Sequence, residues 1–317
     1  MQRLGFSRRS FHRMCAGVLF GRRLLPAAGS APLTWAAQPA VAPGAERRYR
    51  ADALVIVFSV PLLHRKGVGD GSAVWSDSAA EDGSAVRLLA FTGRSNPQRA
   101  AGLNRFGFIQ ELSRTVAGTG AESLYFGVMT SSPEETVAEA RKALHANAGE
   151  APYSAIEGRI AEGSIETAGT RFIARTPASP AEQSELIERA RQALAGAPRK
   201  KTEFQSAEAA PRPFLHALAT LLNEPNSRET RYAYNGRFYR LRVERSRDSK
   251  AAAQFQEAHL IPGAAAVTRI TGSLCREDGG KPIDFRLWIE EGAPRPIPLR
   301  IEYQPKSYLR LTFEALA

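Results

Sequence analysis

The chain has 317 residues, 43% of them hydrophobic and 24% charged, which suits one large globular domain or two small ones. No run of about 18 consecutive apolar residues occurs, and this excludes a transmembrane helix. The net charge of +11 is distributed unevenly along the chain, because residues 1–45 contain six arginines and no Asp, Glu or Lys. Beyond them 37 basic residues face 32 acidic ones, a balance of +5 that gives no support to a nucleic-acid partner and fits weak attraction to anionic lipid or glycan.

The N-terminal segment has the order of an export signal. Arg8, Arg9 and Phe11 form a motif that resembles the twin-arginine signal, and a short apolar run at 14–20 follows it. A region rich in Ala and Pro then extends to residue 45. We therefore expect residues 1–42 to be an export signal and leader, and the working protein to be periplasmic.

The cleavage position and the export route stay open. Small residues favour cleavage after Ala42, although Pro43 follows directly, and the stretch 34–36 is a second candidate. An acid-free leader that contains Arg and Ser also fits an organelle transit peptide or a retained basic tail. Removal of the leader takes away Cys15 and leaves Cys275 alone, so a processed chain forms no internal disulfide.

The pattern from residue 46 onward predicts a β-rich domain. Segments rich in β-branched and aromatic residues predict strands at 49–60, 72–76, 85–92, 104–116, 124–129, 153–165 and 170–174. The glycines at 67–71 are expected to break the chain between the first two strands, and the basic run at 199–201 is expected in a loop. Capping signals predict helices over 132–146 and 180–196.

The last hundred residues alternate most clearly. Leucines at helical spacing predict a third helix over 212–223. Asn235-Gly236 between two alternating segments predicts a hairpin. Further strands are expected at 265–276, 283–290, 297–303 and 309–313. The fold class predicted is mainly β, an antiparallel curved sheet or lipocalin-like barrel of roughly eleven strands with about three helical insertions. The domain 46–317 is expected to be single or to divide into halves at 46–205 and 206–317.

Motifs of known chemistry are missing from the sequence. It contains no GxSxG, HExxH, P-loop or CxxC pattern, so we predict no catalytic residue, no metal ligand and no cofactor. His216 falls inside the third predicted helix and is expected to be a buried, hydrogen-bonded histidine. Aromatic residues and arginines interleave at 232–245, but a glutamate, Glu244, lies among the arginines and the protein is expected to be exported, which also argues against nucleic acid.

Residues 283–314, IDFRLWIEEGAPRPIPLRIEYQPKSYLRLTFE, resemble the end of a bacterial family of envelope proteins classed only as a domain of unknown function. In that family a strand ending near a tryptophan, here Trp288, precedes a polar turn and an apolar strand that opens with proline, here Pro298. A closing strand ends in a carboxylate, here Glu314. The resemblance covers roughly 228–314. It implies a periplasmic protein with a lipocalin-like or lipoprotein-carrier-like curved sheet and without established catalytic residues.

A curved sheet with one apolar face favours a binding or carrier protein for an apolar or lipid-like ligand. The predicted lining consists of alternating apolar residues near the C-terminus: Phe285, Leu287, Ile289, Leu299, Ile301, Leu311 and Phe313. Two alternatives stay open. One is a structural or interaction protein that binds an envelope protein partner, and the other is a hydrolase of envelope polymer, which needs paired carboxylates in a cleft.

Overall fold

The computed structural model describes residue 35 and residues 44–57, 60–80, 82–100, 105–116, 120–131, 150–161, 163–204, 210–306 and 309–317. These described residues all lie in one compact unit, Leu33–Ala317. The predicted helix over 132–146 lies outside them, as does the predicted export signal and leader apart from residue 35.

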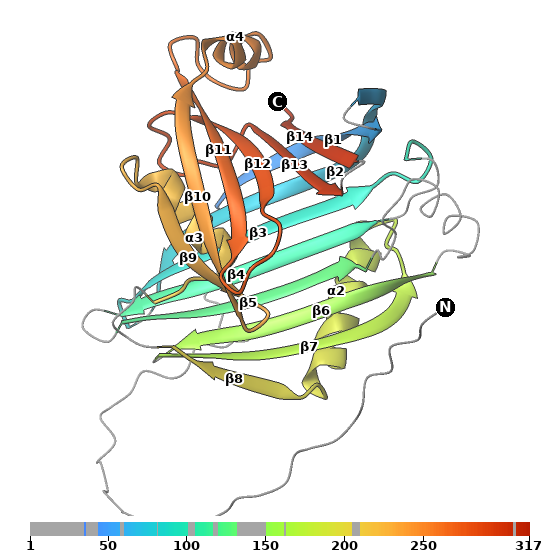
Figure 1. The fold of residues 1–317 in the computed structure, drawn as a ribbon, viewed down its shortest axis with the longest axis vertical. Coiled ribbons are helices and arrows are strands. Elements are labelled where there is room, and N and C mark those ends of the chain that lie inside the picture. Colours follow the sequence, from blue (N-terminus) through green and yellow to red (C-terminus); the bar gives the residue numbers. More distant parts are fainter. Residues whose placement is uncertain are drawn as a thin grey trace, which may run out of the picture. The chain divides into compact units, whose positions relative to one another are not determined.

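In the described part of the chain, fourteen antiparallel strands form a single curved sheet, which confirms the predicted mainly-β fold class (Figure 1). The strands are β1 Ala45–Val57, β2 Val60–Ala79, β3 Ala85–Ser95, β4 Phe106–Val116, β5 Gly120–Thr130, β6 Glu150–Ala161, β7 Ser164–Arg175, β8 Arg199–Glu203, β9 Glu229–Tyr234, β10 Arg237–Arg247, β11 Val267–Arg276, β12 Ile283–Glu290, β13 Arg300–Lys306 and β14 Leu309–Ala315. Their order is β8-β7-β6-β5-β4-β3-β2-β1-β14-β13-β12-β11-β10-β9. The first and last strands therefore pair at the middle of the sheet, and the strands of both predicted halves belong to one sheet.

Two predicted breaks in the sheet are wrong. The glycines at 67–71 lie inside β2, Val60–Ala79, although Gly67 has a φ angle of 62° and the pairing register with β1 shifts beside it. A Cβ atom on Gly71 would lie 2.8 Å from the Thr92 carbonyl oxygen and 3.2 Å from the Phe313 ring, so glycine is required here by close packing rather than by a turn. The basic run at 199–201 is part of the edge strand β8, whose lysines suit an exposed sheet edge.

Two tight turns have the backbone that their residues predict. Asn235 and Gly236 have φ angles of 52° and 64°, the left-handed pair that a two-residue hairpin needs, and this confirms the hairpin of β9 and β10. Gly163, at φ 75°, separates β6 from β7. The strand predicted over 153–165 therefore ends four residues early, at Ala161.

Three helices cover the sheet in the described part of the chain: α2 Pro180–Ala195, α3 Phe214–Asn223 and α4 Ser249–Glu257. The first two confirm predicted helices. Their faces differ, since α3 contacts β3, β4, β9 and β10, whereas α2 contacts β6 and β7 (Figure 1). We call the face that α3 covers the inner face and the opposite one the outer face. The sequence did not predict α4, because this short, alanine-rich segment lacks a leucine stripe.

Candidate functional site

The inner face of the sheet is filled by α3. Phe285, Leu287 and Ile289 of the predicted ligand lining are buried in one cluster with α3 residues Leu221 and Leu222. Phe313 is buried in a neighbouring cluster, and Ile301 and Leu311 pack partly buried against it. Leu299 lies apart, because it is fully buried in the cluster that α4 forms on the outer face. Six of the seven predicted residues thus lie around α3.

Charged side chains hold α3 at both ends. Glu111 of β4 is fully buried, and its carboxylate accepts hydrogen bonds from the backbone N–H groups of Leu215 at 2.8 Å and His216 at 2.9 Å. It thereby caps a helix whose own N-cap residue, Pro213, has no side-chain hydrogen bond. At the other end, Arg245 of β10 donates to backbone carbonyls of the last turn and of the loop after it: Leu221, Glu224 and Ser227. A negative charge at the N-terminus and a positive charge at the C-terminus both interact favourably with the helix dipole. The two side chains therefore stabilise α3 in this position.

The structure confirms His216 as a buried, hydrogen-bonded histidine. Its Nδ1 lies 3.0 Å from Glu111 Oε2, and its side chain is 6% exposed. Within the described part of the chain its Nε2 has no hydrogen-bond partner. A carboxylate–imidazole pair can orient a base in hydrolases. Neither of the hollows described below includes His216, and the bonds of the pair join α3 to β4.

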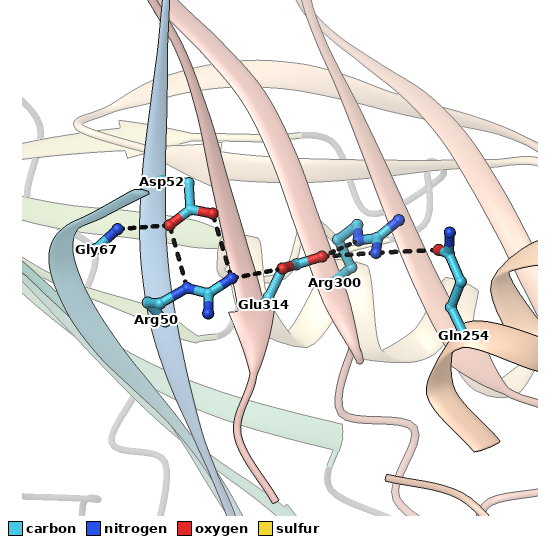
Figure 2. Close-up of polar contacts among 6 residues, drawn as sticks. All are labelled: Arg50, Asp52, Gly67, Gln254, Arg300 and Glu314. Carbon is cyan, nitrogen blue, oxygen red and sulfur yellow. Dashed lines mark hydrogen bonds and ion pairs between the residues drawn. The ribbon is translucent and has the colours of Figure 1, made fainter. Parts of the chain in front are cut away.

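Alternating charges cross the outer face of the sheet where β1 meets β14. Figure 2 shows Arg50 and Arg300 on either side of Glu314, which lie in direct cross-strand register. Arg50 lies 3.0 Å and Arg300 lies 2.6 Å from the Glu314 carboxylate. Asp52, which is 5% exposed, contacts Arg50 and accepts a 2.7 Å hydrogen bond from the Gly67 backbone. This network joins the first and last strands.

The same network positions α4 and the loop that follows it. Arg300 lies over the rings of Phe255 and Trp288, at 5.2 and 5.3 Å. It also donates to Gln254 of α4, as Figure 2 shows. The Trp288 indole donates to Asp248, the N-cap residue of α4, at 3.0 Å. Helix α4 is therefore fixed on β12 and β13 by aromatic and polar contacts.

We expect Asp248→Ala to destabilise the protein by about 1 kcal/mol at pH 7, since the carboxylate caps α4. Hydrogen bonds from the Ala251 backbone and then from Trp288 hold the pKa of Asp248 below its ordinary value of 3.8. This stabilisation is complete above that ordinary value and is lost as the pH falls through the lowered native one. Urea unfolding from pH 7 to pH 2 should show the difference between the two proteins narrowing below about pH 4. A constant difference would contradict the assignment.

A surface hollow lies where the start of β1, the end of β14 and the α4 loop meet. Its volume is about 560 Å³, and we call it the basic hollow; its lining residues are Glu46, Arg47, Arg48, His259, Leu260, Leu316 and Ala317. The Leu316 backbone N–H donates to the Arg48 carbonyl at 2.9 Å, which holds these two segments together. A second, more open hollow lies on residues 256 and 259–263, and it shares His259 and Leu260 with the first.

The lining of the basic hollow combines two arginines, one glutamate and apolar groups. The Arg47 Nη1 atom is buried without a hydrogen-bond partner among the described residues. His259 is exposed, and its φ angle of 56° is that of the left-handed residue that ends α4, where the Leu260 N–H donates to the Phe255 carbonyl at 2.9 Å. Leu316 is 49% exposed. Sequence reasoning missed this site because its residues come from 46–48, 259–260 and 316–317, and only the fold brings them together.

Two kinds of feature are absent from the described residues. No three His, Cys, Asp or Glu side chains of this part of the chain gather as a metal site needs. None of its helices is long and apolar enough to cross a membrane.

Comparisons with known proteins find little similarity in sequence. No family model matches the chain, and no curated protein matches it. Among solved structures, it is similar to the "Beta-barrel-like Protein of Domain of Unknown Function DUF1849 from Brucella abortus". The two share 9% sequence identity with a TM-score of 0.46, over 87% of this chain and 98% of the other.

Proposed function

We propose that this chain is an exported envelope protein that binds an anionic, lipid-like ligand at the basic hollow. One observation carries the proposal: Arg47, Arg48 and His259 line the same hollow as Leu260 and Leu316. Guanidinium groups suit phosphate or carboxylate head groups, and leucines suit the apolar part of such a ligand. The export part of the proposal rests on the twin-arginine-like motif and the acid-free leader.

The packing of the inner face argues against an interior ligand and favours a ligand at the surface. Helix α3 occupies the space beside the predicted lining, and Glu111 and Arg245 hold it at both ends. An interior ligand would have to displace this helix and leave Glu111 buried beside unpaired groups. A surface site requires no such rearrangement.

Of the two alternative functions, an envelope interaction protein has more support than a hydrolase of envelope polymer. Hydrolysis of envelope polymer needs paired carboxylates, and Glu46 is the only acidic side chain that lines either hollow. An interaction protein of the envelope fits the half-exposed Leu316, because an apolar residue in a charged surround also suits a protein partner. Ligand binding and partner binding therefore compete for the same surface.

Vesicle flotation tests the proposed function. The purified protein should bind vesicles of phosphatidylcholine with phosphatidylglycerol, and bind pure phosphatidylcholine vesicles far less. Arg48→Glu changes the charge by two units at the exposed rim of the basic hollow. We expect it to weaken binding by about 2 kcal/mol, roughly thirtyfold. Arg189→Glu makes the same charge change at an exposed position of α2. It should leave the binding affinity within about twofold of the parent protein. Equal losses in both variants would mean that only net charge matters and would reject the hollow as the site.

A further inference from the structure

Trp35 packs on the folded domain although it belongs to the predicted leader. It lies against two apolar clusters at once. One cluster includes Phe126 and the buried side of α2, and the other consists of Val86, Leu112 and Leu124. A single indole thus bridges the edge of α2 and the neighbouring part of the outer face.

Arg191 of α2 builds a specific site for this indole. Its guanidinium lies 5.3 Å from the Trp35 ring centre and 4.8 Å from that of Phe126, so it contacts both aromatic rings. It also donates to Gln110 at 3.4 Å, and Gln110 is the direct cross-strand partner of Phe126. A guanidinium held against two rings and a strand amide recognises an aromatic side chain through cation–π contact. We call Gln110, Leu112, Phe126 and Arg191 the indole site.

The apolar surface beside the site explains why an occupant is needed. Leu112 is fully buried and Val86 is 3% exposed. Helix α2 packs mainly on β6 and β7, and it reaches β4 through the hydrogen bond from Arg191 to Gln110. Among the described residues that pack on this cluster, Trp35 alone comes from outside the β2–β3 hairpin. Removal of Trp35 would therefore open apolar surface on β3 and β4 to water.

We propose that the indole site is a docking site for the chain's own leader, anchored by Trp35, and that the processed protein retains this residue. Export processing then takes place upstream of Trp35, rather than after Ala36 or Ala42. Small residues suited to a signal peptidase are present there, at Ala27-Ala28-Gly29. The proposal goes beyond ligand binding, and it rests on the proposed export only for its processing step.

Mass spectrometry of the exported protein tests the processing step. The full chain is expressed with its own signal, and the intact mass of the periplasmic product is measured. A first residue between 27 and 35 is expected. A product that starts at residue 36 or later overturns the proposal. An unprocessed chain that stays inside the cell overturns the processing step together with the proposed export, while the vesicle assay still tests ligand binding separately.

Substitution and rescue test the docking itself. In the full chain, Trp35→Ala should lower the melting temperature by about 5 °C, and Trp35→Phe should lower it by less than half as much. A synthetic peptide of residues 30–43 added in excess should restore the melting temperature of the alanine variant, and the same peptide with alanine at position 35 should not. Arg191→Gln should abolish this rescue, whereas Arg189→Gln, on the exposed side of the same helix, should preserve it. An unchanged melting temperature in Trp35→Ala, or rescue by both peptides, would overturn the docking site.

Discussion

Glu111→Leu is expected to destabilise the protein by about 3–5 kcal/mol, the cost of removing one partner from a buried polar group that binds several others. The substitution keeps an apolar side chain of similar size on β4. It leaves the backbone N–H groups of Leu215 and His216, and the Nδ1 of His216, without their acceptor. Urea unfolding followed by circular dichroism measures the loss. Glu111→Gln retains one acceptor oxygen and should lose roughly half as much.

The matched control is Glu244→Leu, which makes the same change at an exposed strand position and should stay within about 0.5 kcal/mol of the parent. Arg245→Leu removes the group at the other end of α3 and should also destabilise. If both residues act by holding α3, the double variant loses less than the two single losses together. Strict additivity, or a Glu111→Leu loss below about 1 kcal/mol, would contradict the docking of α3 by these charges.

The contact between Glu111 and His216 could not be predicted from the sequence. Alternation in β4 predicts that Phe106, Phe108 and Leu112 share one face and that Ile109 lies on the other, and the register of the sheet confirms it. Glu111 then falls on the face of Ile109, which is an ordinary place for a solvated carboxylate. Its partner His216 is 105 residues away, and no local pattern links them. Only the curvature that brings α3 onto β4 turns a surface-like glutamate into a buried helix cap.

Sequence signals predicted the structure most reliably where a few adjacent residues determine the backbone conformation. Asn235-Gly236 and the capping box of Ser179 and Glu182 are such cases, and both are found as their residues predict. The glycines of β2 misled because glycine serves two purposes. It permits turns, and it also lets another chain segment or ring approach closely. The sequence alone does not separate these two uses, because the approaching group comes from a distant strand.

Two glycines that allow a ring to approach closely, Gly158 and Gly272, are expected to matter strongly for the stability of the protein. Gly158 is the cross-strand partner of Tyr125, and a Cβ atom on it would lie 2.2 Å from the tyrosine ring. Gly272 pairs with Phe285 in the same way, with a Cβ distance of 2.1 Å to the ring. Each ring is buried and lies over the glycine of the neighbouring strand. Such pairs let a sheet curve while its inner face stays packed with large side chains.

Gly158→Ala should therefore destabilise the protein by about 2–4 kcal/mol, because the Tyr125 ring must leave its position and the core around it must shift. Gly107→Ala is the control, since it lies in β4 and a Cβ atom there meets nothing closer than Met129 Cβ at 4.0 Å. It should be neutral or stabilise slightly, as alanine reduces the freedom of the unfolded chain. Denaturant unfolding of both variants measures the difference in their free energies of unfolding. Combining Gly158→Ala with Tyr125→Leu should recover part of the loss, because the smaller side chain no longer needs the glycine. If Gly158→Ala is as stable as Gly107→Ala, the ring-over-glycine contact does not support the curvature of this sheet.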